Sequence, residues 1–255
     1  MTQMLASVTS VEEALLALEL GADIIDLKNP HDGALGALPL ATLASIVIAI
    51  DGRRTVSATI GDTSDDPARI ARKVVATAAT GVDIVKIGIA TSRLALGQLP
   101  QLAFRQGKAD LAGPGPATGG EPEPASTRLV AVLFADKAFD LAWIDVLAER
   151  GFYGVMLDTA DKHAGGLRSH CDDAQLRNFV RRAHSKHLMC GLAGSLRLDD
   201  ISPLLALSPD YLGFRGALCR NTSRTDRLDA DAFRAVRARI FELDGTSEPF
   251  ASSVA

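Results

Sequence analysis

Short apolar runs alternate with longer helical patterns along the whole chain. The longer segments carry apolar residues at helical spacing and charges on another face, as in DLAWIDVLAER and DDAQLRNFVRRAHSK. The short runs are typical of buried strands and occupy residues 4–10, 23–29, 55–61, 83–89, 129–135, 154–160, 188–194 and 211–217. Strands that alternate with helices usually form a parallel sheet, so the pattern predicts an α/β fold.

Eight strands, each followed by a helix, favour a closed (β/α)8 TIM barrel. Its usual length of about 250 residues matches the 255 residues of this chain. An open doubly wound sheet is the alternative, although such sheets generally have fewer strands. We therefore expect one catalytic barrel domain over residues 1–244.

Two segments interrupt this pattern. Residues 107–127 are rich in Gly and Pro and lack apolar periodicity, which predicts a flexible surface loop before the fifth strand. An active-site lid is the alternative, but a loop that precedes a strand lies on the face opposite the usual active site. Residues 245–255 are expected to be a flexible tail.

Composition and charge narrow the function classes. The chain has 27 Lys and Arg against 31 Asp and Glu, for a net charge of -4, which argues against a nucleic-acid surface. The start of the chain has no export signal and no apolar run is long enough for a membrane span, so a cytoplasmic protein without a membrane partner is expected. A homo-oligomer is also expected, because barrels of this kind often associate.

Neither a disulfide framework nor a metal site is indicated. The three cysteines are widely spaced and predicted to be buried or partly buried thiols. His163, His170 and Cys171 lie close together after the sixth predicted strand, but their spacing matches no established zinc pattern. We interpret the two histidines as surface residues and expect no metal.

Three lysines at or near strand ends are the main candidates for chemistry. Lys28 ends the second predicted strand, Lys86 lies in the fourth and Lys162 follows the sixth. Lysine is seldom buried without a partner, and pairing with carboxylates such as Asp26 and Asp158 would be an ordinary structural explanation. Converging lysines also lower the pKa of at least one of them through repulsion, which leaves a neutral amine able to attack a carbonyl group. The nearby aspartates could orient the amines or transfer protons.

Loops after the seventh and eighth strands commonly bind phosphate in this fold. Glycines allow close approach of the backbone, a serine hydroxyl can donate, and an arginine can offer a bidentate fork. The second strand also runs into an Asn-Pro loop over the expected site, although simple turns would look similar. The candidate substrate-binding residues are Asn29, Gly194, Ser195, Arg215, Gly216 and Ala217.

No Walker loop, dinucleotide fingerprint or nucleophile elbow is found, which makes ATP use, hydride transfer and serine hydrolysis less favoured. Six segments instead resemble the (5-formylfuran-3-yl)methyl phosphate synthases of the methanofuran pathway, in order and spacing. They are GADIIDLKNPHDGALGA, VSATIGD, GVDIVKIGI, MLDTADK, GLAGSL and GFRGALC.

The resemblance implies a lyase reaction that needs no metal or organic cofactor. Two molecules of the small phosphorylated aldehyde glyceraldehyde 3-phosphate would condense to 4-(hydroxymethyl)-2-furancarboxaldehyde phosphate, with loss of phosphate and water. The resemblance makes Lys28 the Schiff-base lysine and Lys86 the proton acceptor. It also marks Asp26, Asp158 and Lys162 as active-site residues.

The segment after the eighth strand, CRNTSRTDRLD, departs from the family pattern, so the resemblance assigns no role to Arg220, Arg224 or Arg227. The 107–127 segment also looks longer and richer in Pro and Gly than the family's. Two other functions stay open: a Schiff-base aldolase of the deoxyribose-phosphate type, and a catalytically silent barrel that binds a sugar phosphate.

Overall fold

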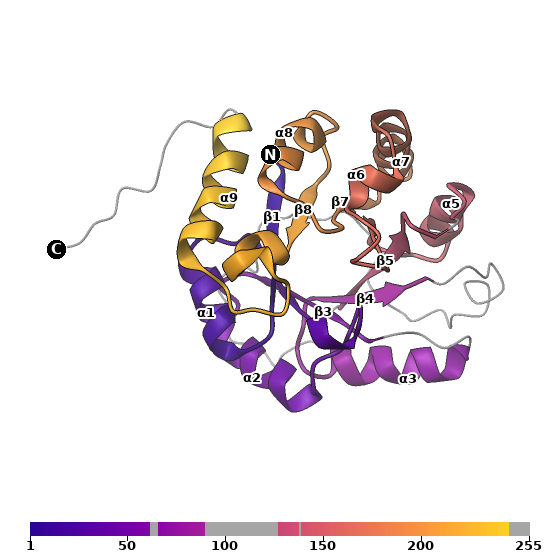
Figure 1. Cartoon of the computed structure of the whole chain (residues 1–255). Coiled ribbons are helices and arrows are strands. Elements are labelled where there is room, and N and C mark those ends of the chain that lie inside the picture. Colours follow the sequence, from indigo (N-terminus) through magenta and orange to yellow (C-terminus); the bar gives the residue numbers. More distant parts are fainter. Residues whose placement is uncertain (62–65, 90–126, 138, 245–255) are drawn as a thin grey trace.

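The computed structural model describes residues 1–61, 66–89, 127–137 and 139–244 (Figure 1). The predicted 107–127 loop, apart from Thr127, and the predicted 245–255 tail lie outside these residues. The last helix ends at Leu243, close to the end of the expected domain.

Eight parallel strands close into one barrel in chain order, with β8 paired back to β1. The closure confirms the predicted (β/α)8 barrel and rules out the open doubly wound sheet. Each of the eight apolar runs overlaps one of the strands, although β1 and β5 begin one residue before the predicted run. Their bounds are β1 Gln3–Val8, β2 Ile24–Leu27, β3 Thr55–Thr59, β4 Ile84–Gly88, β5 Arg128–Phe134, β6 Gly154–Asp158, β7 Met189–Leu192 and β8 Tyr211–Phe214.

Helices surround the barrel on the outside (Figure 1). The α-helices are α1 Val11–Glu19, α2 Leu40–Ile50, α3 Pro67–Ala78, α5 Ala142–Glu149, α6 Leu167–His170, α7 Asp173–Ser185, α8 Leu198–Leu205 and α9 Ala230–Leu243. Three short 3-10 helices lie in the loops after β2 and β8: η1 Pro30–Asp32, η2 Gly216–Leu218 and η3 Arg220–Thr222.

Side-chain caps fix the starts of several helices. Ser10 accepts a hydrogen bond from the N–H of Glu13 at the start of α1, and Asp66 caps α3 ahead of a proline at its first position. Asp172 and Gln175 form a reciprocal capping box at the start of α7. These caps satisfy N–H groups that an α-helix leaves without internal partners, so the starts of these three helices are set locally.

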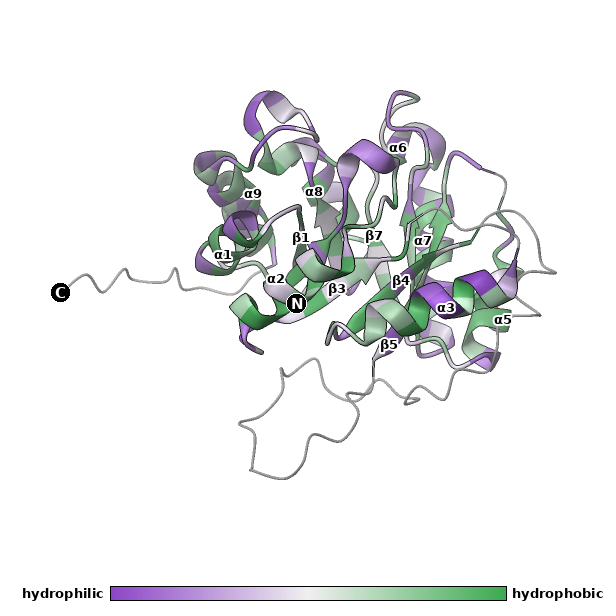
Figure 2. Ribbon diagram, turned by 90° about the horizontal axis from the view of Figure 1, so that it is seen from below, coloured by the Kyte–Doolittle hydropathy of each residue, from purple (hydrophilic) through white to green (hydrophobic). Residues whose placement is uncertain are grey.

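Each helix turns an apolar face to the barrel. In α3, Ile70 and Val74 are buried while Arg69 and Arg72 are exposed, and the hydropathy colouring of this helix shows both kinds of residue (Figure 2). The strands supply the matching surface, because alternate residues point outward. In β6, Val155 and Leu157 pack with the core between barrel and helices.

The other residues of each strand point into the barrel, whose interior changes character along its axis. Its lower part is apolar and contains Leu5, Ile24, Ile84, Met156 and Tyr211. Toward the carboxyl ends of the strands, the inward positions become polar. The buried polar residues there include Ser7, Asp26, Lys28, Ser57, Thr59, Lys86 and Asp158. Within the described strands, the buried charged side chains therefore gather toward the mouth.

The Tyr211 ring fills the apolar part of the barrel and requires a glycine on the neighbouring strand. A Cβ atom added to Gly191 would lie 2.1 Å from Cζ of Tyr211. The inward position opposite Tyr211 in the β7–β8 register therefore has no room for any side chain.

We expect Gly191→Ala to reduce the free energy of unfolding by about 1–3 kcal/mol or more, because a methyl group would overpack a closed core. Urea denaturation measures the loss. Tyr211→Leu in the same chain removes the clashing ring, so the double variant should lose less than the sum of the two single variants. Additive losses would mean that the ring and the glycine are not coupled.

Candidate active site

Five charged side chains predicted for the active site come together at the barrel mouth. Each interacts electrostatically with at least one other member of the group, and Lys28 interacts electrostatically with all four of the others. The group consists of Asp26, Lys28, Lys86, Asp158 and Lys162.

Asp26 is completely buried and lies between two serines that the sequence analysis missed. The parallel register places Ser7 of β1 and Ser57 of β3 beside it, so all three side chains point inward. The Ser7 hydroxyl donates to Oδ2 at 3.0 Å and the Ser57 hydroxyl to Oδ1 at 2.7 Å. The Lys86 Nζ atom lies 2.6 Å from Oδ1. Burial alone would raise the pKa of Asp26, but Lys86, Lys28 and these hydrogen bonds hold that pKa below its ordinary value.

Asp158 forms a second ion pair across the mouth. The Lys162 Nζ atom lies 2.5 Å from Oδ1 of Asp158 and 3.1 Å from the hydroxyl of Thr159. Burial opposes ionisation of Asp158, yet Lys162, Lys28 and the N–H of Thr159 lower its pKa to about 2. Asp158 is therefore an anion, held where β6 ends.

Lys28 differs from the other two lysines because its amine has no hydrogen bond or ion pair within the described parts of the chain. Its residue is only 9% exposed. Burial lowers its pKa to about 8; attraction from Asp158 and Asp26 opposes this shift, and repulsion from Lys162 and Lys86 adds to it. Desolvation, rather than the repulsion between lysines that the sequence suggested, is therefore the main cause of the lowered Lys28 pKa.

The arrangement supplies one reactive amine between two lysine–carboxylate pairs. Near neutral pH a fraction of Lys28 is uncharged and able to attack a carbonyl carbon. The two pairs offer groups that can donate or accept protons within the same buried space. The site can therefore capture a carbonyl compound and move protons around it.

We expect the reactivity of Lys28 toward an acylating reagent to rise with pH and level off above about pH 8, because only the neutral amine is a nucleophile. Competitive labelling read by peptide mass spectrometry gives the midpoint. Asp158→Asn removes a carboxylate that raises the pKa of Lys28, so its midpoint should move to lower pH. A wild-type midpoint near 10.5, the ordinary value, would contradict the assignment.

The loop after β2 packs down into the mouth. Ala34 and Leu35 are buried in the interior core, and a Cβ atom added to Gly88 would lie 2.4 Å from Cδ1 of Leu35. The side chain of Asn29 caps this loop by accepting from the N–H of His31 and donating to Asp32. The loop therefore covers part of the barrel mouth in a defined conformation. Substrate binding by Asn29 stays a prediction.

The two loops predicted to bind phosphate follow the carboxyl ends of β7 and β8. Gly194 and Ser195 adopt positive φ angles of 117° and 50° and turn the chain sharply. No hydrogen bond to a described residue uses the N–H groups of Gly194, Ser195, Gly216 or Ala217. These groups remain candidate phosphate donors, as predicted.

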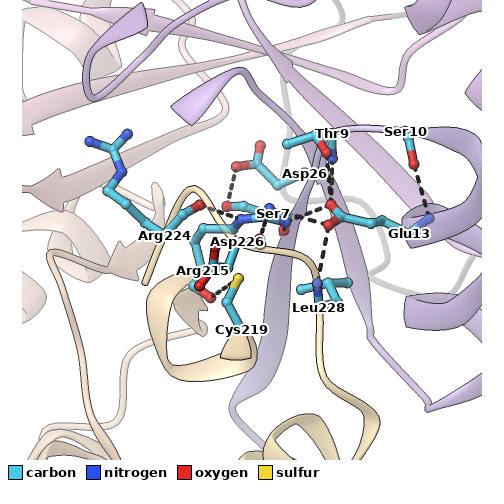
Figure 3. Close-up of polar contacts among 10 residues, drawn as sticks. All are labelled: Ser7, Thr9, Ser10, Glu13, Asp26, Arg215, Cys219, Arg224, Asp226 and Leu228. Carbon is cyan, nitrogen blue, oxygen red and sulfur yellow. Dashed lines mark hydrogen bonds and ion pairs between the residues drawn. The ribbon is translucent and has the colours of Figure 1, made fainter. Parts of the chain in front are cut away.

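The prediction that Arg215 binds phosphate through a bidentate fork is wrong, because all of its donors bind acceptors within the protein. Arg215 and Glu13 form a buried ion pair with a shortest distance of 2.6 Å (Figure 3). All five guanidinium N–H groups have acceptors: the Glu13 carboxylate twice and the carbonyl oxygens of Ser7, Arg224 and Asp226. The pair ties the loop after β8 to β1 and α1, which sequence alone did not reveal.

We expect Arg215→Gln to lower the free energy of unfolding by about 3–5 kcal/mol, since it leaves the Glu13 carboxylate buried and without its counter-charge. Chemical denaturation measures the change. Arg239→Gln is the control, because its contact with Glu242 is exposed and worth less than about 1 kcal/mol. If Arg215→Gln left the stability unchanged, the ion pair would not be structural and Arg215 would again be a candidate for binding phosphate.

The histidines and cysteine after β6 do not share one environment. His163 is exposed as predicted, whereas His170 is half-buried and its Nε2 atom has no hydrogen-bond partner in the described structure. Cys171 is buried, as are Cys190 and Cys219, which confirms the prediction of buried thiols. Within the described ranges, no helix combines the length and apolarity that a membrane span needs.

The barrel and its lysine–carboxylate mouth define a (β/α)8-barrel enzyme of the kind that places its active site at the carboxyl ends of the strands. The chain belongs to the 4-HFC-P synthase family, whose family model matches residues 4–237. This match confirms the resemblance found in the sequence.

Proteins similar in sequence to this chain carry names that agree with this family. A protein of Methylorubrum extorquens, provisionally named (5-formylfuran-3-yl)methyl phosphate synthase, is 41% identical over 240 residues, which are 92% of each chain. The (5-formylfuran-3-yl)methyl phosphate synthase of Methanopyrus kandleri is 34% identical over 233 residues, 87% of this chain and 91% of that one. The enzyme of that name from Methanosarcina acetivorans is 31% identical over 231 residues, 88% and 93% of the two chains.

Solved structures show the same architecture at much lower identity. The phosphoribosyl anthranilate isomerase of Thermotoga maritima superposes with a TM-score of 0.64 at 13% identity, over 95% of this chain and 100% of that one. The isomerase of Thermus thermophilus gives a TM-score of 0.63 at 15% identity, with the same coverage. At such identity the likeness concerns the fold alone.

Proposed function

We propose that the protein is a Schiff-base lyase that condenses two molecules of glyceraldehyde 3-phosphate to (5-formylfuran-3-yl)methyl phosphate, a step toward methanofuran or a related one-carbon carrier. The observation that carries the proposal is the buried Lys28 amine, whose pKa is lowered to about 8 and which has no ion-pair partner among the described residues. Family membership supports the choice of product.

In the first step, the neutral Lys28 amine attacks the carbonyl carbon of one triose phosphate, and loss of water gives an iminium ion. The lysine then acts as the electron sink, because the iminium acidifies the adjacent carbon. The new positive charge lies in the same buried space as Lys86, and each charge disfavours the other.

The Lys86 amine, in its neutral form, accepts the proton from the carbon next to the iminium. Asp26 is the group placed to exchange protons with that amine, since their atoms lie 2.6 Å apart. The resulting enamine carbon attacks the aldehyde of the second triose phosphate and forms the carbon–carbon bond.

The later steps remove inorganic phosphate and water, hydrolyse the Schiff base so that the Lys28 amine is regenerated, and close an aromatic ring, whose formation drives the reaction forward. The Lys162–Asp158 pair also interacts electrostatically with Lys28 and is available to protonate leaving oxygens. The N–H groups after β7 and β8 have no acceptor among the described residues, which supports a role for them in binding a phosphoryl group.

Borohydride reduction in the presence of glyceraldehyde 3-phosphate, followed by peptide mass spectrometry, tests the proposal. We expect a stable adduct on Lys28, a furan aldehyde absorbance and release of inorganic phosphate, all lost in Lys28→Ala because the other two lysines described at the mouth, Lys86 and Lys162, have carboxylate partners. Lys137→Ala, at an exposed lysine after β5, should behave like the wild-type protein.

Two other outcomes would contradict the proposal in different ways. An adduct on Lys28 without furan or phosphate would identify a Schiff-base aldolase. A complete absence of adduct from the wild-type protein would leave a barrel that binds its ligand without this chemistry.

A further inference from the structure

Three arginines in the loop after β8 have different environments, which the sequence could not distinguish. Arg220 is exposed, with 71% of its side chain accessible, and lies 3.8 Å from Asp229. Arg227 is also exposed and interacts electrostatically with Glu12. Arg224 is half-buried, and its Nη2 atom donates to the carbonyl oxygen of Gly33 at 2.6 Å.

The contact with Gly33 places the Arg224 guanidinium at the barrel mouth. Gly33 belongs to the loop that directly follows Lys28 at the end of β2. Arg224 also interacts electrostatically with the carboxylate of Asp158 at the end of β6. Burial lowers the pKa of Arg224, while attraction from Asp158 raises it. The side chain therefore reaches from the loop after β8 toward the other elements that form the site.

The backbone at Arg224 is held in place by the side chain of Arg215. The Nε atom of Arg215 donates to the carbonyl oxygen of Arg224 at 2.9 Å, and Arg215 is itself held by Glu13. In Figure 3 the Arg224 side chain points away from this buried pair. Arg215, which was predicted to bind phosphate, thus holds the loop from which the Arg224 guanidinium extends.

Arg224 differs from the neighbouring cations in its lack of a counter-charge. Lys86 pairs with Asp26, Lys162 with Asp158, and Arg215 with Glu13. In the described part of the chain, Arg224 has no carboxylate partner, and its Nε and Nη1 atoms donate to no described residue. A half-buried guanidinium with unused donors is matched in charge and geometry by a phosphoryl group.

We propose that Arg224 binds the phosphoryl group of one substrate molecule and makes the site selective for phosphorylated aldehydes. The proposal rests on the proposed function and goes beyond it, because a condensation of two triose phosphates has two phosphoryl groups to hold. The N–H groups after β7 and β8 receive one, and Arg224 receives the other on the side of the mouth nearer Lys28 and Gly33.

The test compares borohydride trapping on Lys28 with glyceraldehyde 3-phosphate and with unphosphorylated glyceraldehyde. In Arg224→Gln, we expect the preference for the phosphorylated aldehyde to fall about 10- to 100-fold, the range for loss of hydrogen bonds to a charged group. Arg224→Lys should keep part of the preference, since a lysine supplies charge without the fork. Arg220→Gln and Arg227→Gln are matched controls on the same loop and should keep all of it.

An Arg224→Gln protein that traps glyceraldehyde normally and keeps the Arg220→Gln preference would overturn the proposal. Circular dichroism and the rate with unphosphorylated glyceraldehyde separate this result from a folding defect, and Arg224→Lys serves if the glutamine variant does not fold.

Titration calorimetry with inorganic phosphate decides the proposal independently of any reaction. We expect Arg224→Gln to bind phosphate more weakly or at fewer sites than Arg220→Gln, and equal binding would reject the role of Arg224. If wild-type protein forms no Lys28 adduct with either aldehyde, the proposed function fails, while this binding comparison still decides the role of Arg224.

Discussion

The buried carboxylate of Asp26 is the constraint on which the mouth of the barrel depends. A carboxylate removed from water is stable as an anion only when hydrogen bonds and a counter-charge replace its hydration. Register supplies Ser7 and Ser57 from the two neighbouring strands, and Lys86 supplies the charge. Because Ser7 also accepts from Arg215 through its carbonyl oxygen, the same strand end connects the lysine site to the loop after β8.

Much of the fold could be predicted because strand and helix periodicities are local properties. Each of the eight apolar runs overlaps a strand, and polar residues at or near their carboxyl ends identified Asp26, Lys28, Lys86 and Asp158. Ser7 and Ser57 were missed, although a detectable signal exists: both are polar residues at inward positions of strands beside Asp26. Finding them requires the register between strands, which the sequence of one strand does not contain.

The errors concern side chains whose partners are distant in sequence. Arg215 follows β8, where an arginine could face either a ligand or the protein, and its partner Glu13 lies 202 residues earlier. Only closure of β8 against β1 brings the two together. The cause of the Lys28 pKa shift was misjudged for a similar reason, since a list of lysines shows repulsion but not the depth of burial. Three-dimensional burial, rather than residue type, decided both cases.

The charges at the mouth can be read as one system in which pairing separates structural from reactive groups. Lys86 and Lys162 each have a carboxylate within hydrogen-bond distance, so their charges are balanced before any ligand arrives. Lys28 and Arg224 have none among the described residues, and the two respond differently. An amine can release its proton when desolvated, whereas a guanidinium stays charged and requires an anion. The same lack of a partner therefore makes Lys28 suited to attack a carbonyl carbon and Arg224 suited to hold a phosphoryl group.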